Sequence, residues 1–215
     1  MEEAPQRAVD QDVAIMTAQA ESMETPPQTP GSAAKGWRSV LVWLGLALVL
    51  RWAVLEPRWI PSGSMLPTLQ LQDRILVEKV RPKLGSGVPT GSIVVFRAPE
   101  QLVAAGYDPT AALIKRVIGQ PGDVVEVRDG MLLRNGTAVS EPWRREAIDY
   151  AFGPVTVPDH HLLVLGDNRN ASLDSHVWGP LPEQDLIGTA VLRYWPLNRA
   201  GPIRFPAPGA DNQLG

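Results

Sequence analysis

Cysteine is absent from the 215-residue sequence. Without a thiol the protein cannot form a disulfide, use a cysteine nucleophile or hold zinc through thiolates. Histidine is also scarce, with three residues, two of which are the adjacent pair His160 and His161. Adjacent residues cannot present both rings on one helical face at the spacing of metal ligands, so we expect neither a metal site nor another cofactor.

A basic stripe is lacking as well, since the formal net charge is −3. The first 34 residues contain six acidic residues and one arginine, while the remaining residues contain 17 acidic and 19 basic ones. Binding to phosphates needs clustered lysine and arginine side chains. Nucleic acid is therefore not an expected partner.

Long apolar runs are limited to one, in which no residue from 39 to 50 is charged. A helix over residues 37–55 would be about 28 Å long, close to the thickness of the hydrocarbon core of a bilayer. Arg51 opposes burial in lipid, but it lies within one turn of the end and its long side chain can reach the interface. We expect an uncleaved transmembrane helix over residues 37–56, preceded by a disordered acidic and proline-rich tail over residues 1–36.

No helical pattern of similar strength follows residue 60. Short runs rich in Val, Ile and Leu predict strands, separated by turn sequences, at residues 74–79, 92–97, 113–118, 123–128, 161–165 and 187–195. Two Asx-Gly pairs, at residues 129–130 and 135–136, are typical of hairpin turns. We predict a mainly β domain over residues 57–205, built as a partly open β-barrel or as stacked sheets, with a frayed C-terminus over residues 206–215.

Two serines lie in the segment PSGSMLP at residues 61–67, shortly after the apolar run. Proline fixes φ and glycine frees it, so the segment predicts a rigid, sharply shaped loop that can hold a hydroxyl away from its own backbone. Taken alone, Ser62 and Ser64 are better explained as ordinary turn residues. The short connection to the apolar run nevertheless means that any chemistry at Ser64 would occur close to the membrane surface.

Lys115 favours a catalytic role for one of these serines over a turn role alone. It lies in a predicted apolar strand and shares a strand face with Leu113 and Val117. Most lysines of this kind lie on edge strands, where the ammonium group reaches water. If Lys115 is instead buried, desolvation lowers its pKa from about 10.4 toward neutrality, and the amine can act as a general base. A serine beside a neutral lysine is an activated nucleophile.

A Ser-His-Asp arrangement is the competing interpretation of the same sequence. No Gly-x-Ser-x-Gly nucleophile elbow occurs, and the pair His160-His161 fits the polar entry to a strand. We therefore favour a serine–lysine pair.

Four segments, in order, resemble the motifs of bacterial type I signal peptidases. They are IPSGSMLPTL at residues 60–69, GSIVVF at 91–96, KRVIGQPGD at 115–123 and GDNRNASLDS at 166–175. The resemblance covers about residues 40–195. It implies a membrane-bound serine endopeptidase with a Ser/Lys dyad, which removes N-terminal signal peptides from exported precursor proteins after an Ala-x-Ala-like site.

The resemblance also implies roles for individual residues. Ser64 would be the nucleophile and Lys115 the general base, while the Ser62 hydroxyl and the Ser64 backbone amide would form the oxyanion hole. Small side chains of the substrate would bind in shallow pockets lined by Ile60, Pro61, Met65, Leu69, Ile75, Leu113 and Ile114.

Further family positions imply supporting residues. Ser172 would orient the Lys115 amine, with Asp174 behind it, and Arg116 and Asp167 would form an ion pair. His176 is a departure, because the family usually has an arginine there. We therefore expect the contact between Asp174 and His176 to be sensitive to pH.

The expected partners are precursor proteins that carry signal peptides, the lipid bilayer and, by proximity, the protein export machinery. Lys35 and Arg38 favour a cytoplasmic N-terminus, which would place the catalytic domain on the outer face of a bacterial membrane. Two alternatives stay open. One is a self-cleaving Ser/Lys protease of the SOS-repressor type, which would lack the anchor; the other is a membrane-tethered β module without enzymatic activity.

Overall fold

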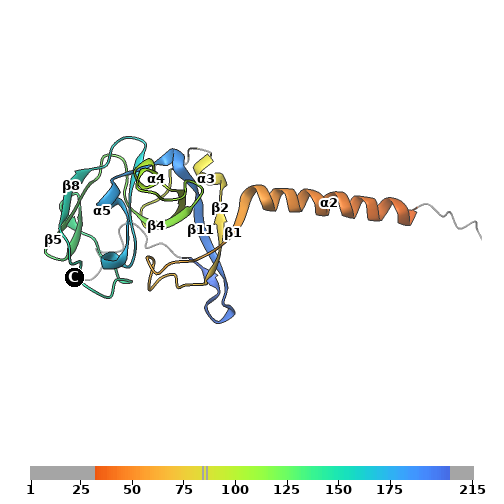
Figure 1. Cartoon of the computed structure of the whole chain (residues 1–215). Helices are drawn as coiled ribbons and strands as arrows, with labels where there is room; N and C mark the ends of the chain where they lie inside the picture. Colours follow the sequence, from red (N-terminus) through yellow and green to blue (C-terminus); the bar gives the residue numbers. More distant parts are fainter. Residues whose placement is uncertain (1–31, 84, 86, 204–215) are drawn as a thin grey trace, which may run out of the picture. The chain divides into compact units, whose positions relative to one another are not determined.

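The computed structural model describes residues 32–83, 85 and 87–203, and the chain divides into two units between Ala47 and Leu48. Helix α2, Ser32–Val54, begins inside the predicted tail and ends before the predicted end of the anchor (Figure 1). Its large apolar side chains from Trp37 to Val49 are exposed. The sequence predicts a transmembrane helix here; among the described residues, however, no helix combines the length and apolarity needed to cross a membrane. Residues 1–31 of the predicted tail and the whole predicted frayed segment, residues 206–215, lie outside the described residues.

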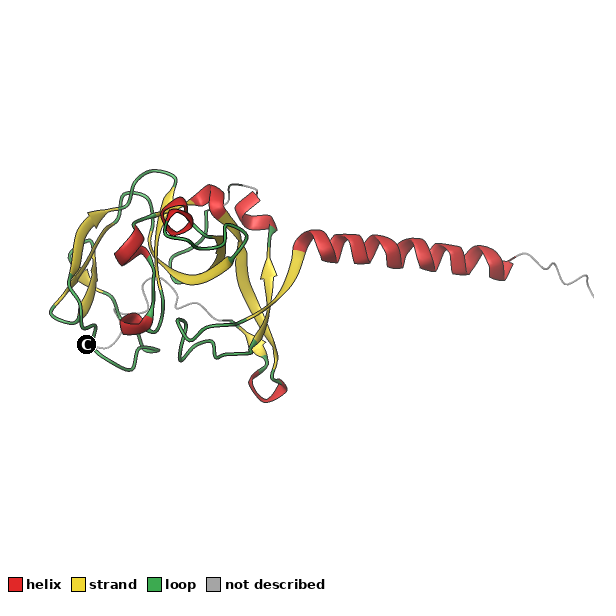
Figure 2. Cartoon of the chain, in the orientation of Figure 1, coloured by secondary structure: helices red, strands yellow, loops and turns green. Residues whose placement is uncertain are grey.

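The unit that follows is built mainly from strands, as predicted (Figure 2). The strands are β1 Leu55–Trp59, β2 Arg74–Glu78, β3 Ile93–Arg97, β4 Ala112–Gly119, β5 Val124–Arg128, β6 Met131–Arg134, β7 Thr137–Ala138, β8 Phe152–Thr156, β9 His161–Leu165, β10 Leu181–Pro182, β11 Leu186–Trp195 and β12 Gly201–Pro202. Between them lie the short helices α3 Val80–Lys83, α4 Glu100–Ala104 and α5 Ser175–Trp178, and the 3₁₀ turns η1 Arg169–Ala171, η2 Glu183–Asp185 and η3 Leu197–Arg199.

These strands form two sheets, and all their described pairings are antiparallel. The larger sheet has the order β1-β2-β11-β3-β4-β9-β10, with β12 also paired to β11. The smaller sheet has the order β7-β6-β5-β8, and its strands β5 and β8 lie on the left in Figure 1. Within the described residues neither strand order closes on itself, so the arrangement is one of open sheets rather than a closed barrel.

The six predicted strands correspond to β2, β3, β4, β5, β9 and β11, with ends that differ by one residue at most. The segments around residues 99–112 and 140–158, where the sequence shows no clear helix or strand pattern, contain α4 and β8. Strand β8 includes Gly153 and Pro154, residue types that are depleted in strands, which explains why it gave no signal.

Both Asx-Gly pairs form the predicted hairpin turns. Asp129 and Gly130 have φ values of 53° and 74°, and they join β5 to β6; Asn135 and Gly136 have φ values of 52° and 78°, and they join β6 to β7. Positive φ at both central residues is what a type I′ turn requires.

Strand pairing places Lys115, on β4, beside the start of the segment 166–175. β4 lies between β3 and β9, with Val94 opposite Lys115 and Leu165 opposite Arg116. Lys115 is therefore on an interior strand, and the edge-strand explanation for an apolar-flanked lysine does not apply. The segment 166–175 follows β9 directly, so it emerges beside β4.

The serine loop, residues 61–69, is fixed to the larger sheet by its apolar side chains. Met65 and Leu69, together with Ile60 just before the loop, belong to one buried cluster that also contains Ile114, the neighbour of Lys115. Ile60 also makes two backbone hydrogen bonds with residues just beyond the loop, accepting from Gln72 at 2.8 Å and donating to Asp73 at 2.9 Å. Core packing thus sets the position of Ser64.

Candidate active site

Ser64 and Lys115 are in direct contact. The Lys115 Nζ donates a hydrogen bond to the Ser64 Oγ at 2.9 Å and another to the carbonyl of Ile114 at 3.0 Å. Only 9% of Ser64 and 5% of Lys115 is exposed. An amine and a hydroxyl at this distance can exchange a proton without any movement of the backbone.

Burial lowers the pKa of the Lys115 ammonium to about 8, against the opposing effect of the carboxylates of Asp174 and Asp167, which raise it. At this pKa about a tenth of the amine is uncharged at pH 7. The lysine is thus poised between its two protonation states near physiological pH, as a general base should be.

Two groups near the Ser64 hydroxyl can donate hydrogen bonds to an oxyanion. The Ser62 Oγ lies 3.4 Å from the Ser64 Oγ. The Ser64 backbone amide has no hydrogen-bond acceptor among the described residues. Both donors are therefore available to a developing negative charge.

Asn168 holds the serine loop from the side of the 166–175 segment. Its backbone amide donates to the carbonyl of Ser64 at 3.0 Å, and its side-chain amide donates to the carbonyl of Gly63 at 3.2 Å. The sequence alone predicts no role for Asn168. The only available signal was its place in the last family motif, because its partners lie about a hundred residues away in the chain.

Ser172 and Asp174 lie on the same segment, but their contacts differ from the expected ones. The Ser172 Oγ is buried and has no hydrogen-bond partner in the described part of the chain, so the expected bond to the Lys115 amine is not formed. Asp174 accepts from the backbone amide of Gly166 at 2.8 Å and from His176 Nδ1 at 2.7 Å. The His176 ring in turn stacks on Tyr150, with 4.2 Å between the centroids. Asp174 thus affects Lys115 through its charge rather than through a hydrogen bond.

Gly166 lies where the serine loop and the 166–175 segment are packed tightly together. A Cβ atom there would be 2.2 Å from the Ser172 Oγ and 2.6 Å from the Ser64 carbonyl oxygen. We expect Gly166→Ala to lower the free energy of unfolding by about 1–3 kcal/mol, as overpacking does, and to reduce activity by displacing Ser64. Urea unfolding and precursor cleavage measure the two effects.

Gly201→Ala is the matched control for this substitution, since a Cβ at Gly201 meets no atom within 4 Å among the described residues. It should leave both quantities unchanged. Wild-type activity and stability in Gly166→Ala would contradict the close packing of these segments.

Arg116 and Asp167 form a buried ion pair beside the site. Two hydrogen bonds join them, at 2.7 Å from Nε and 2.6 Å from Nη2, and Arg116 also donates to the carbonyl of Gly91 at 2.7 Å. The Arg116 guanidinium stacks on the Trp143 ring at 4.2 Å. A second buried pair, between Arg169 and Glu141, adjoins it. Glu141 and Trp143 lie in the segment around residues 140–158, where the sequence shows no clear helix or strand pattern.

A cavity of about 210 Å³ with a mostly apolar lining lies beside the loop, and it is called the apolar cavity below. Five of the seven predicted substrate-binding residues line it: Ile60, Pro61, Ile75, Leu113 and Ile114. Four further residues, which were not predicted, complete the lining: Arg58, Trp59, Val95 and Ala112. Met65 and Leu69 do not line it; both are fully buried in the core. Their backbone is joined by a hydrogen bond from the Leu69 amide to the Met65 carbonyl, as in one helical turn, which turns both side chains inward.

A family model described as "Signal peptidase, peptidase S26" matches residues 34–195. The chain belongs to this signal peptidase family. As a member it is a hydrolase of the signal peptidase I type, an enzyme that cleaves signal peptides.

Curated signal peptidases resemble the chain over most of its length. A probable signal peptidase I-1 of Synechocystis is 49% identical over 164 residues, covering 76% of this chain and 83% of the relative. A signal peptidase I of Leptolyngbya laminosa is 42% identical over 191 residues, covering 85% and 94%. A probable chloroplastic thylakoidal processing peptidase 2 of Arabidopsis thaliana is 46% identical over 163 residues, covering 74% and 43%. These relatives favour a signal peptidase over both alternatives, the self-cleaving protease and the binding module.

Proposed function

We propose that this signal peptidase cleaves precursors with a Ser64–Lys115 dyad, after an Ala-x-Ala-like site and at a membrane. The observation that carries the proposal is the 2.9 Å contact between the Lys115 Nζ and the Ser64 Oγ, with the amine almost fully buried. Burial of an amine favours its neutral form, the form that can take a proton from serine.

In the acylation step, the neutral Lys115 amine takes the hydroxyl proton as the Ser64 Oγ attacks the scissile carbonyl. The Ser64 backbone amide and the Ser62 hydroxyl donate to the resulting oxyanion. The Lys115 ammonium then gives its proton to the leaving amine, the C–N bond breaks, and the signal peptide stays attached to Ser64 as an ester.

In the deacylation step, Lys115 is neutral again and takes a proton from a water molecule that attacks the ester. The ester bond to Ser64 breaks, and the proton returns to the Ser64 Oγ as the signal peptide leaves with a new carboxyl end. Asp174 supports both steps by electrostatic stabilisation of the ammonium form of Lys115, and Ser172 remains a proposed positioning residue for the amine.

The apolar cavity supports the proposed preference for small residues. Its volume is about 210 Å³ and its lining is mostly aliphatic. Small apolar side chains such as alanine fit such a cavity, whereas a charged side chain would lose its hydration there.

Attachment to a membrane is part of the proposal. It is supported by the exposed apolar side chains of α2 and by the thylakoidal name of the Arabidopsis relative. We propose that α2 holds the enzyme at the membrane from which signal peptides emerge, close to the export machinery. Retention of the full chain in the membrane pellet after extraction at alkaline pH tests this attachment, and release into the supernatant would contradict it.

The proposed function predicts a specific cleavage assay. Detergent-solubilised full-length protein should cut a precursor after its Ala-x-Ala site, and Ser64→Ala should remove that activity. Mass spectrometry of both products identifies the bond that is cut. Cleavage by the Ser64→Ala variant at the wild-type rate would exclude the proposed nucleophile.

A further inference from the structure

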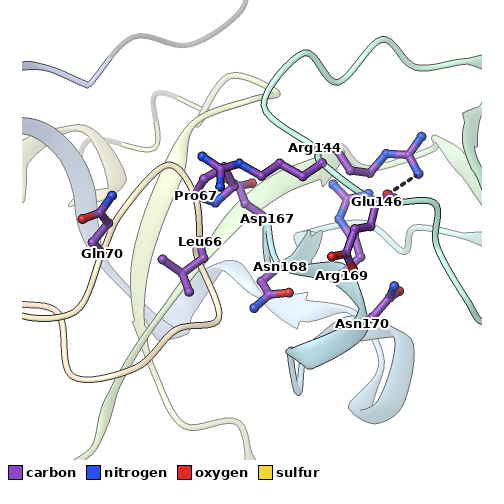
Figure 3. A pocket seen from close by; sticks show the side chains of 10 residues that line it. Leu66, Pro67, Gln70, Arg144, Glu146, Asp167, Asn168, Arg169 and Asn170 are labelled. Atoms are coloured by element: carbon purple, nitrogen blue, oxygen red, sulfur yellow. Dashed lines mark hydrogen bonds between the residues drawn. The ribbon is translucent and has the colours of Figure 1, made fainter.

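A second cavity, of about 230 Å³, adjoins the serine loop and shares no lining residue with the apolar cavity. We call it the polar pocket; it is lined by Leu66, Pro67, Gln70, residues 144–146 and residues 167–170. Figure 3 shows Leu66, Pro67 and Gln70 on one side of it, with Asn168, Arg169 and Asn170 opposite. Nothing in the catalytic steps above uses this pocket.

The position of the polar pocket relative to Ser64 sets which part of a substrate can reach it. The apolar cavity is lined by residues that precede Ser64, from Arg58 to Pro61, and the polar pocket by residues that follow it, Leu66 and Pro67. Asn168, which also lines the polar pocket, holds the Ser64 carbonyl. Along the chain, the loop residues that line the two cavities thus lie on either side of Ser64.

A peptide that crosses Ser64 occupies both sides. If the residues before the scissile bond lie in the apolar cavity, the residues after it lie toward the polar pocket, and an extended chain advances only about 3.3 Å per residue. The first few residues of the mature protein are therefore the ones within reach of the polar pocket.

Most charges of the polar pocket are neutralised within the protein. Asp167 is paired with Arg116, and Arg169 is paired with Glu141. Arg144 lies 3.5 Å from Glu141 and also donates to the carbonyls of Gly130 and Glu146.

Arg145 is the exception among the arginines. It is exposed and makes no hydrogen bond or ion pair within the described part of the chain. The Glu146 carboxylate is likewise exposed and unpaired there. The charged residues of the pocket and their ion-pair partners carry a net charge of +1. The four positive ones are Arg116, Arg144, Arg145 and Arg169, and the three negative ones are Glu141, Glu146 and Asp167.

We propose that the polar pocket binds the first residues of the mature protein and that Arg145 favours an acidic side chain among them. The inference rests on the proposed function, since it needs a peptide bound across Ser64. A guanidinium without an internal partner can pair with a substrate carboxylate at no cost to the fold, and it repels a lysine placed there.

The test is a set of precursors that differ only in the first three residues after the scissile bond. Each position in turn carries Glu, Gln or Lys, and kcat/KM is measured with detergent-solubilised full-length enzyme at low salt. For at least one position the wild-type enzyme should cleave the Glu precursor about three to five times faster than the Lys precursor, a ratio typical of one exposed charge pair. Arg145→Gln should bring this ratio close to one, and Arg145→Glu should invert it.

Arg128→Glu is the matched control, because Arg128 is an exposed arginine on β5, outside the polar pocket. It should keep both the wild-type ratio and the wild-type rate. An equal Glu-to-Lys ratio in wild type and Arg145→Glu would overturn the proposal, as would the absence of a preference at all three positions. Failure of the proposed function is a different result, since wild type would then leave the Gln precursors uncut as well.

Discussion

Replacing Lys115 with methionine is expected to lower kcat for precursor cleavage by about a thousandfold, within the range that a general base contributes. Lys115 is the group within hydrogen-bonding distance of the Ser64 Oγ that can take its proton, since the other side chain there is the Ser62 hydroxyl. Methionine fills a similar volume and carries no charge, so the buried site at Lys115 should accept it without unfolding. Single-turnover cleavage and a thermal melt together separate loss of the base from loss of the fold.

A double variant sharpens this prediction. Because the serine and the lysine act as one unit, Ser64→Ala combined with Lys115→Met should be no less active than either single variant. Two losses that multiply would mean that the residues act independently. Retention of more than about a tenth of the wild-type kcat by Lys115→Met would show that general-base catalysis by this amine is not needed.

Replacing Asp167 with alanine should lower the free energy of unfolding by about 3–5 kcal/mol, because it leaves the Arg116 guanidinium buried without its partner. Arg116 is 2% exposed, so water cannot take the place of the carboxylate without a rearrangement of the packing. For a chain of this size the loss corresponds to a fall in Tm of roughly 10 °C. Differential scanning calorimetry of the detergent-solubilised protein measures it.

Asp159→Ala is the matched control, since Asp159 is exposed and its carboxylate makes no hydrogen bond in the described part of the chain. Its effect should stay within about 0.5 kcal/mol. Removing both partners, with Arg116→Met and Asp167→Leu, should recover part of the stability because no charge is then left buried alone. A Tm for Asp167→Ala equal to that of wild type would contradict the buried pair.

The β architecture was predictable because alternation and turn chemistry are local. β4 and β9 are visible in the sequence as runs of branched apolar residues. The Asn135-Gly136 turn is predictable because both residue types tolerate positive φ. Strand β8 gave no such signal. Its stability comes from pairing with β5, which no short window of sequence contains.

The candidate site was predictable in part, through the family motifs and through the unusual place of Lys115 in an apolar strand. The contacts that could not be predicted join residues far apart in the sequence: Asn168 with the Ser64 carbonyl, and Arg169 with Glu141. The sequence also could not separate apolar residues that line a cavity from those that fill the core. Ile60 and Met65 belong to the same buried cluster, yet Ile60 also lines the apolar cavity whereas Met65 does not.

The proposed mechanism depends on burial lowering the pKa of the Lys115 amine far enough for a useful fraction of it to be neutral near physiological pH. An NMR titration of the lysine ε-methylene groups in full-length protein measures this directly, and the signal lost in Lys115→Met gives the assignment. We expect a midpoint near 8, the pKa to which burial lowers this amine. A midpoint near 10.4, the value of a lysine in water, would contradict it.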